Sequence, residues 1–126
     1  MEGYKQKPAF LQGGKPVLLQ GAMELEIAQL RGALTGCRSF QYGTFLFWEG
    51  KLGDQPVGLV VEALRTGIGA AAAAAATAVG CAVFQPSLVL NQGTAGGYPD
   101  DLHPFDLVVG ERWFNANALF QSRYGK

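Results

Sequence analysis

The chain is 126 residues long, with ten basic and ten acidic side chains and a formal net charge of zero. This length is sufficient for one domain with a hydrophobic core, and the balanced charge argues against binding to nucleic acid or to an anionic membrane surface. No run of about 18 apolar residues is present, so no membrane-spanning helix is expected. The single histidine and the two widely separated cysteines lack metal-ligand spacing, so we expect no metal site.

Residues 1–15 lack the apolar core of a signal peptide. We expect them to form a loosely ordered leader ahead of one domain at residues 16–126. Cys37 and Cys81 are interpreted as reduced core residues, which is typical of a cytoplasmic protein.

The first elements predicted along the chain are a buried strand and an amphipathic helix. The apolar run at residues 16–20 ends at Gly21 and is typical of a strand. Apolar residues then recur at three- and four-residue spacing and predict a helix over 23–34 that ends near Gly36; they are Met23, Ile27, Leu30 and Leu34. Glu24 and Glu26 fall in its first turn, where the helix dipole by itself favours negative charge.

A hairpin and a second helix are predicted next. Residues 40–50 are aromatic and residues 57–63 are aliphatic, with the turn-forming pair Gly53 and Asp54 between them. This pattern predicts two antiparallel strands. Residues 70–84 begin with seven consecutive alanines, which are strong helix formers, and Pro86 stops that helix.

The last predicted elements are a buried strand at residues 88–91, a glycine-rich loop at 93–97 and a strand at 107–110. The order of elements predicts an α/β fold with three layers and a mixed, mostly parallel sheet. Glycine-containing stretches follow three of the predicted strands, at residues 21–26, 67–69 and 93–97. Since open α/β sheets bind ligands at the carboxyl ends of their strands, this pattern indicates a small-molecule site.

These stretches together resemble the nucleoside phosphorylase and nucleosidase superfamily, and most of all the 5'-methylthioadenosine/S-adenosylhomocysteine nucleosidases. The family's Gly-Ala-Met-Glu-x-Glu corresponds to residues 21–26, and its Ser-Gly-Ile-Gly before an alanine-rich helix corresponds to 66–69. Its Asn-x-Gly-Ser-Ala-Gly-Gly corresponds to 91–97, with threonine for serine at Thr94, and its Asp-Leu-Val-Val strand to 106–109. The resemblance covers about residues 16–118 and implies a nucleoside phosphorylase-like fold.

The resemblance implies hydrolysis of the N-glycosidic bond of a purine nucleoside carrying a 5'-thio substituent, with no cofactor. Glu26 would be the general base for the water, since an oxocarbenium-like sugar needs a carboxylate near the attacking water. Thr94 would help to hold that water or the ribose. The remaining substrate-binding positions would be apolar walls at Met23 and Ile68 and backbone groups around the base at Ala95 and Gly96.

Two further motifs of the family are not found in the sequence. They are a Met-Glu pair that grips the ribose hydroxyls and an aspartate that protonates the purine. Asp100, Asp101 and Asp106 are instead predicted to be solvated turn residues or caps. We therefore expect the chain to be the N-terminal half of such an enzyme, a truncated product or a degenerate relative, and activity of the chain by itself to need a C-terminal half.

Three alternatives remain open. Phosphorolysis is the nearest, but phosphorylases place an arginine where Asn91 stands, and Arg65 is only a distant substitute. A dinucleotide fingerprint at residues 67–72 lacks the acidic residue expected after the next strand. The chain could also be a non-catalytic nucleoside-binding or dimerising fragment, with tail aromatics such as Trp113 at an interface. The resemblance implies a homodimer, and we expect His103 to lie at a surface or interface.

Overall fold

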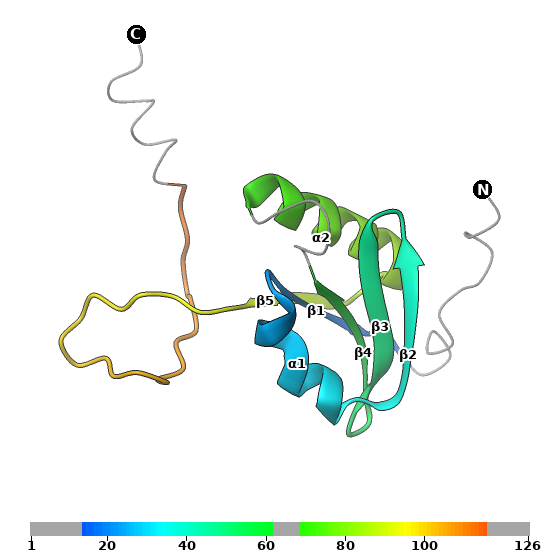
Figure 1. Ribbon diagram of the computed structural model, residues 1–126, viewed down its shortest axis with the longest axis horizontal. Coiled ribbons are helices and arrows are strands. Elements are labelled where there is room, and N and C mark those ends of the chain that lie inside the picture. Colours follow the sequence, from blue (N-terminus) through cyan, green and yellow to red (C-terminus); the bar gives the residue numbers. More distant parts are fainter. Residues whose placement is uncertain (1–13, 62–68, 116–126) are drawn as a thin grey trace, which may run out of the picture. The chain divides into compact units, whose positions relative to one another are not determined.

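The computed structural model describes residues 14–61 and 69–115. The chain divides into two compact units, Met1–Thr94 and Ala95–Lys126. Every helix and strand among the described residues lies in the first unit (Figure 1). In chain order they are β1 (Val17–Gly21), α1 (Glu24–Ala33), β2 (Thr35–Tyr42), β3 (Phe45–Leu52), β4 (Gln55–Val61), α2 (Ala70–Phe84) and β5 (Leu88–Gln92).

The strands form one mixed sheet in the order β2-β3-β4-β1-β5. β1 is parallel to both β4 and β5, whereas β2 and β4 are each antiparallel to β3. The prediction of an α/β fold with a mixed sheet is confirmed. The sheet is not mostly parallel, however, because residues 35–42 add an antiparallel strand that the sequence pattern does not predict.

The register of the parallel strands determines where the site can form. Gly21, the last residue of β1, pairs with Val61 at the end of β4 and with Gln92 at the end of β5. The carboxyl ends of all three strands therefore reach the same edge of the sheet. The segments that leave β1 and β5 start there side by side.

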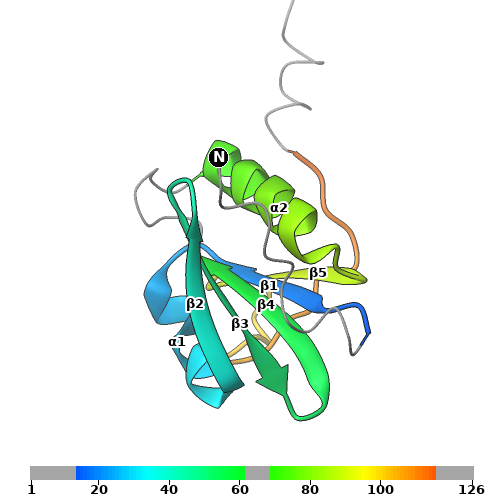
Figure 2. The same ribbon diagram turned by 90° about the vertical axis from the view of Figure 1, so that its right-hand side faces the viewer.

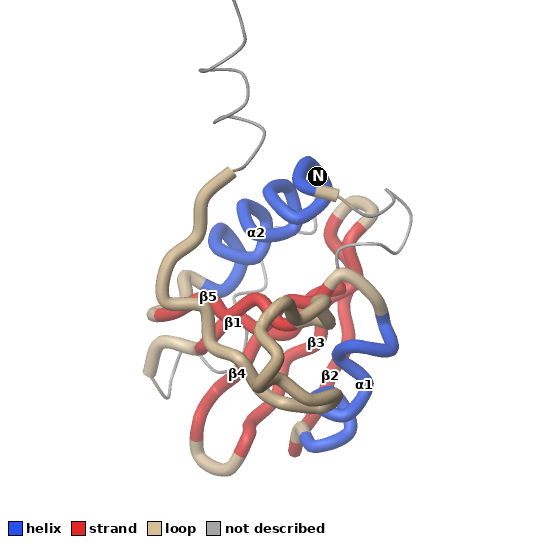
Figure 3. The backbone as a smooth tube through the Cα atoms, turned by 90° about the vertical axis from the view of Figure 1, so that its left-hand side faces the viewer, coloured by secondary structure: helices blue, strands red, loops and turns tan. Residues whose placement is uncertain are grey.

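The two helices cover opposite faces of the sheet (Figures 1 and 3). Successive side chains of a strand point to opposite faces, and β1 illustrates this. Leu18 belongs to the core cluster under α2 with Phe84, while Leu19 belongs to the cluster under α1 with Ile27. The unit thus has three layers, with the sheet in the middle.

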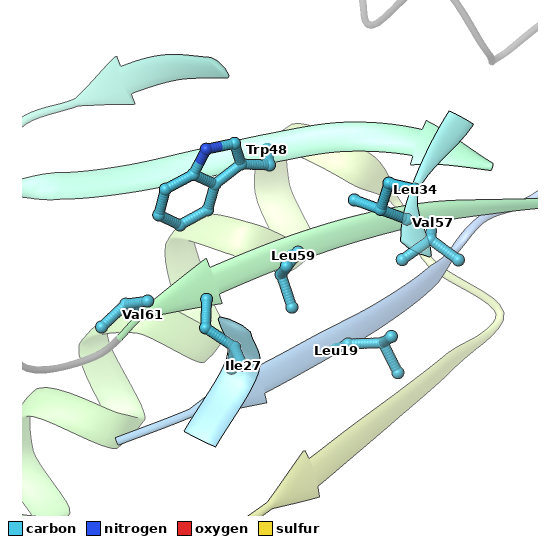
Figure 4. Packing of buried hydrophobic residues seen from close by; sticks show 7 residues of the cluster. All are labelled: Leu19, Ile27, Leu34, Trp48, Val57, Leu59 and Val61. Carbon is cyan, nitrogen blue, oxygen red and sulfur yellow. The ribbon is translucent and has the colours of Figure 1, made fainter. Parts of the chain in front are cut away.

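The α1 cluster is built from aliphatic residues and one tryptophan, shown in Figure 4: Leu19, Ile27, Leu34, Trp48, Val57, Leu59 and Val61. Ile27 is fully buried and is the residue that anchors the helix to the sheet. The guanidinium of Arg31 lies 5.3 Å from the centre of the Trp48 ring, a cation–π contact between α1 and β3. These contacts fix the helix that carries the glutamates.

The α2 layer uses small residues to bring the helix close to the sheet. Its buried positions, at four-residue spacing, are Ala72, Ala76, Gly80 and Phe84. Phe84 packs on Phe40 and Phe47 of the edge hairpin, with ring centres 5.7 and 5.8 Å away. Figure 2 shows α2 on one side of the sheet and the hairpin of β2 and β3 at the edge of the sheet. A Cβ atom on Gly58 of β4 would lie 2.8 Å from three carbons of the Phe84 ring, so only glycine fits under it.

The predicted antiparallel hairpin is confirmed, because β3 and β4 pair on either side of a turn at Gly53 and Asp54. Two other predictions for this region are wrong. The strand predicted at residues 40–50 is interrupted by a turn at Gly43, where φ is +57°, a conformation that favours glycine. Tyr42 ends β2 and Phe45 begins β3. Cys37 is exposed on β2 and is not a core residue, because only the far end of that strand, at Phe40 and Tyr42, packs against the hydrophobic core. Cys81 is half-buried. Both thiols are free.

The strand predicted at residues 107–110 is also wrong. These residues have no regular secondary structure, and the side chains of Leu107 and Val109 are 92% and 85% exposed. An apolar segment forms a strand only when another strand satisfies its backbone groups. Within the described part of the second unit no strand is present to do so. The leader predicted at residues 1–15 lies almost entirely outside the described residues.

The packing of Gly58 under Phe84 predicts opposite effects for one substitution at two glycines. Gly58→Ala should lower the free energy of unfolding by about 1–3 kcal/mol, because the added methyl overpacks a closed core. In Gly32→Ala, within α1, no atom lies within 4 Å of the added methyl. This substitution should raise the free energy of unfolding by about 0.5–1 kcal/mol, because alanine favours the helix more than glycine does. Urea unfolding of both variants measures this. A Gly58→Ala variant as stable as Gly32→Ala would contradict the packing described.

Candidate functional site

The candidate site lies where β1 passes into α1, beside the loop that follows β5. The passage is tight: a Cβ atom on Gly21 would lie 2.6 Å from Ile27 Cγ2, 3.5 Å from the Gln92 carbonyl oxygen and 3.6 Å from Glu26 Cβ. Glycine at position 21 therefore lets the first turn of α1 approach the end of β5. Glu26 belongs to that turn and is half-buried.

Glu26 caps its own helix. Met23 is the N-cap residue, and its side chain has no oxygen to accept from the free N–H groups of the first turn. The Oε2 atom of Glu26 accepts hydrogen bonds from the backbone N–H groups of Ala22, at 3.0 Å, and Met23, at 3.1 Å. This is the glutamate half of a capping box, and it fixes one carboxylate oxygen.

Thr94 contacts the other carboxylate oxygen. Its backbone N–H donates to Glu26 Oε1 over 3.2 Å, and its hydroxyl lies 3.4 Å from the same atom. The two residues are 68 positions apart in the sequence. Gly93, the residue before Thr94, also lies close to this oxygen, since a Cβ atom on Gly93 would be 3.1 Å from Glu26 Oε1. The structure thus brings Glu26 and Thr94 into contact, and their roles toward water and substrate stay predictions.

A third contact joins the loop to the backbone of Glu26. The side-chain amide of Gln92 donates a hydrogen bond from Nε2 to the Glu26 carbonyl oxygen, at 2.5 Å. Glu26 is therefore held at its main chain by the last residue of β5 and at its side chain by Thr94, two residues later. Both attachments come from the same strand end.

The hydrogen bonds determine the ionisation of Glu26. Partial burial by itself would raise its pKa, but the N–H groups of Thr94, Met23 and Ala22 and the Thr94 hydroxyl all favour the charged form. Their combined effect exceeds that of burial and holds the pKa of Glu26 below its usual value. Glu26 is consequently a carboxylate at neutral pH.

Glu24, the other glutamate of the first turn, is engaged differently. It forms an ion pair with Arg31 of the same helix, and its side chain is 58% exposed. Glu24 is therefore a surface residue near a helix N-terminus, where the helix dipole favours negative charge. Arg38 pairs with the buried Glu49, so two of the described basic residues are committed away from Glu26.

The other sequence-predicted site residues fall into three groups. Met23 lies at the site, with its side chain 41% exposed and its N–H on Glu26. Ile68 lies outside the described residues. Ala95 and Gly96 begin the second unit and are exposed there, and their assignment to the purine base stays a prediction.

In the second unit, the acidic residues have the expected turn character. Asp106 accepts a hydrogen bond from the backbone N–H of His103 at 2.8 Å, and Asp100 and Asp101 lie in an exposed turn. The described residues contain no cluster of histidine, cysteine or carboxylate side chains suited to a metal ion. Among them there is also no helix long and apolar enough to cross a membrane.

Sequence reasoning missed two contributors to the site, Ala22 and Gln92. Glutamate three residues after the N-cap is half of a capping-box signal, but methionine at position 23 lacks the oxygen of the other half, so the signal is incomplete. Gln92 has no local signal, because its partner is 66 residues away. Only the parallel register of β1 and β5 brings it to the site.

Comparison with known proteins identifies the family. The model of the phosphorylase superfamily matches residues 16–125, so the chain belongs to this superfamily. It is 41% identical over 91 residues to a 5'-methylthioadenosine/S-adenosylhomocysteine nucleosidase of Aeromonas salmonicida. The matched region covers 72% of this chain and 38% of that relative. A nucleosidase of the same name from Colwellia psychrerythraea is 40% identical over 89 residues, or 71% of this chain and 35% of that relative.

Solved structures give the same result for the fold. The Colwellia psychrerythraea nucleosidase, crystallised in complex with adenine, superimposes with a TM-score of 0.65 at 37% identity, over 71% of this chain and 35% of that one. The Neisseria meningitidis nucleosidase, in complex with methylthio-immucillin-A, has a TM-score of 0.64 at 36% identity, over 71% of this chain and 37% of that one. The chain thus spans less than two fifths of the length of these relatives.

The ionisation of Glu26 predicts a pH-dependent contribution to stability. Because its pKa in the folded state is lowered, the contribution is complete above the usual glutamate value and is lost as the pH falls through the folded-state pKa. At pH 7 Glu26→Gln should lower the free energy of unfolding by about 0.5–2 kcal/mol, the range for loss of a helix cap. Unfolding curves of both proteins at several pH values should converge in acid.

Glu24→Gln is the matched control for this experiment. Its ion pair is largely solvent-exposed, so its loss should cost no more than about 0.5 kcal/mol. The hydrogen-bonding pattern described would be contradicted if the loss of unfolding free energy in Glu26→Gln stayed constant down to acidic pH. It would also be contradicted if that loss equalled the loss in Glu24→Gln.

Proposed function

We propose that the chain carries the water-activating part of a nucleosidase site, which hydrolyses the N-glycosidic bond of 5'-methylthioadenosine/S-adenosylhomocysteine-like purine nucleosides. The observation that supports this most strongly is the Glu26 carboxylate, ionised and held against Thr94 at the carboxyl edge of the parallel strands. It occurs in a chain that is similar to nucleosidases of this name over 91 residues. The proposed base is Glu26.

The chemistry requires a carboxylate near the attacking water. Breaking the bond between the ribose and the purine gives an oxocarbenium-like sugar, and the water that adds to it must lose a proton. In the structure the carboxylate of Glu26 accepts from four donors, of which the Thr94 hydroxyl is the most distant at 3.4 Å. We propose that water enters at Oε1 in place of that contact, with the Thr94 hydroxyl then bonded to the water.

The lowered pKa makes Glu26 a weak base that is already ionised when it meets the water. It is ionised across the neutral range, but the hydrogen bonds that favour the carboxylate also weaken its attraction for a proton. A weak base suffices when the electrophile is highly reactive, as an oxocarbenium-like sugar is. Glu26 would accordingly orient the water first and accept its proton late in the reaction.

The proposal assigns to this chain one side of the reaction only. Met23, Ile68, Ala95 and Gly96 are proposed to contact the sugar, its 5' substituent and the base. Since the chain spans less than two fifths of its relatives, groups that grip the ribose and neutralise the departing purine are proposed to come from a region that the chain does not match. No cofactor is required, because proton transfer and water addition complete the reaction.

The ion pairs of two arginines favour hydrolysis over phosphorolysis. A phosphate nucleophile needs a cationic clamp, whereas Arg31 and Arg38 are bonded to Glu24 and Glu49. Arg65, which the sequence analysis names as a distant substitute for such an arginine, lies outside the described residues.

The test is release of adenine from 5'-methylthioadenosine, measured by chromatography with and without phosphate. The chain is assayed alone and together with the part of the Aeromonas salmonicida relative that it does not match. We expect phosphate-independent release that falls by about 100-fold or more in Glu26→Gln, the range for loss of a general base. Glu24→Gln, in the same helical turn, should stay within about twofold of the unaltered chain because its side chain is committed to Arg31.

Three results would count against the proposal. Release that depends on phosphate would indicate phosphorolysis. Equal loss of activity in the two variants would remove Glu26 from its role. Binding of 5'-methylthioadenosine in a calorimeter without release in either assay would favour a nucleoside-binding module.

A further inference from the structure

We propose that Gln92 is a positioning residue for Glu26: its side-chain amide fixes the first turn of α1 to the end of β5 and so sets the carboxylate against Thr94. This inference rests on the proposed function for its catalytic consequence. Its structural content, that Gln92 controls the environment of the Glu26 carboxylate, is independent of it.

The side chain of Gln92 attaches the end of β5 to the first turn of α1. Gln92 is half-buried at the last position of β5 and pairs with Gly21 in the sheet. Its Nε2 atom donates to the carbonyl oxygen of Glu26, a backbone group of α1. A helical carbonyl oxygen has a second lone pair beyond the one used within the helix, so this bond adds to the helix without breaking it.

Three consecutive residues lie against Glu26. Gln92 holds its carbonyl group, Gly93 passes within contact distance of its carboxylate, and Thr94 donates to Oε1. Main chain and side-chain tip are thus attached to one short segment. A shift of the α1 turn relative to β5 would change the Thr94 distances directly.

The other contacts of α1 with the sheet are of a different kind. α1 is fixed to the sheet mainly by apolar contacts, with Ile27 fully buried and Leu34 nearly so. Apolar contacts are non-directional and allow small sliding movements, whereas a hydrogen bond specifies direction. Arg31 contacts Trp48 further along the helix. Loss of the Gln92 amide should therefore leave α1 folded but allow its first turn to move.

The test compares Gln92→Leu with Gln41→Leu. The second variant is a matched control, because Gln41 also donates from Nε2 to a backbone carbonyl oxygen, that of Gly43, but does so on exposed β2. Titration of the Glu26 side-chain carboxyl by carbon NMR should give a raised pKa in Gln92→Leu and an unchanged pKa in Gln41→Leu. With adenine release as the second readout, Gln92→Leu should lower kcat about tenfold and leave KM within about twofold.

A merely structural role would lower the stability of Gln92→Leu without moving the Glu26 pKa, and that result would overturn the inference. If Gln92→Leu does not fold, Gln92→Asn replaces it: the amide is kept but is one methylene too short to reach Glu26. The same pKa shift is expected there, and an unchanged pKa overturns the inference equally. A shifted pKa in a chain that releases no adenine would support the positioning role while contradicting the proposed function. Adenine release with the Glu26 pKa and kcat both unchanged in the Gln92 variant would contradict the positioning role while leaving the proposed function in place.

Discussion

The parallel pairing of β1 with β5 is the constraint on which the site depends. Its register places Gly21 beside Gln92, so the chain leaves β1 for α1 at the point where β5 gives way to its loop. Glycine at position 21 removes the side chain that would hold these segments apart. Two residues 68 positions apart, Glu26 and Thr94, then lie within hydrogen-bond distance. A one-residue slip would also exchange Leu18 and Leu19 between the two core layers, so packing and site require the same register.

Glu26 combines two tasks that make opposite demands. As the cap of α1 it accepts N–H groups from Ala22 and Met23, which fixes its geometry and lowers its pKa. As the proposed base it should be able to take a proton from water, which a lowered pKa makes less favourable. The arrangement favours orientation over basicity. This suits a reaction in which the sugar is already highly electrophilic when water adds, and it leaves the Thr94 side of the carboxylate as the place for the water.

Local sequence patterns predict most of the fold: apolar runs predict β1 and β5, apolar spacing predicts α1, and the run of alanines before Pro86 predicts α2. It does not predict β2, where polar and small residues at 35–39 become a strand only because β3 provides hydrogen-bond partners. The reverse holds at residues 107–110, which have a strand-like sequence but no strand beside them in the described part of the second unit. The resemblance to nucleosidases supplied Glu26 and Thr94. Gln92 required the tertiary structure, since nothing near it in the sequence indicates its partner.

The most direct test of this account is a pH titration of the unaltered chain, followed through the backbone amide signals of Ala22, Met23 and Thr94 in proton–nitrogen NMR spectra. All three N–H groups donate to the Glu26 carboxylate. They should therefore shift together with one common midpoint, below the usual pKa of a glutamate side chain. A Thr94 amide that titrates independently of the other two, or a common midpoint at or above the usual value, would contradict the central claim. That claim is that the segment before α1 and the segment after β5 together hold Glu26 as a carboxylate.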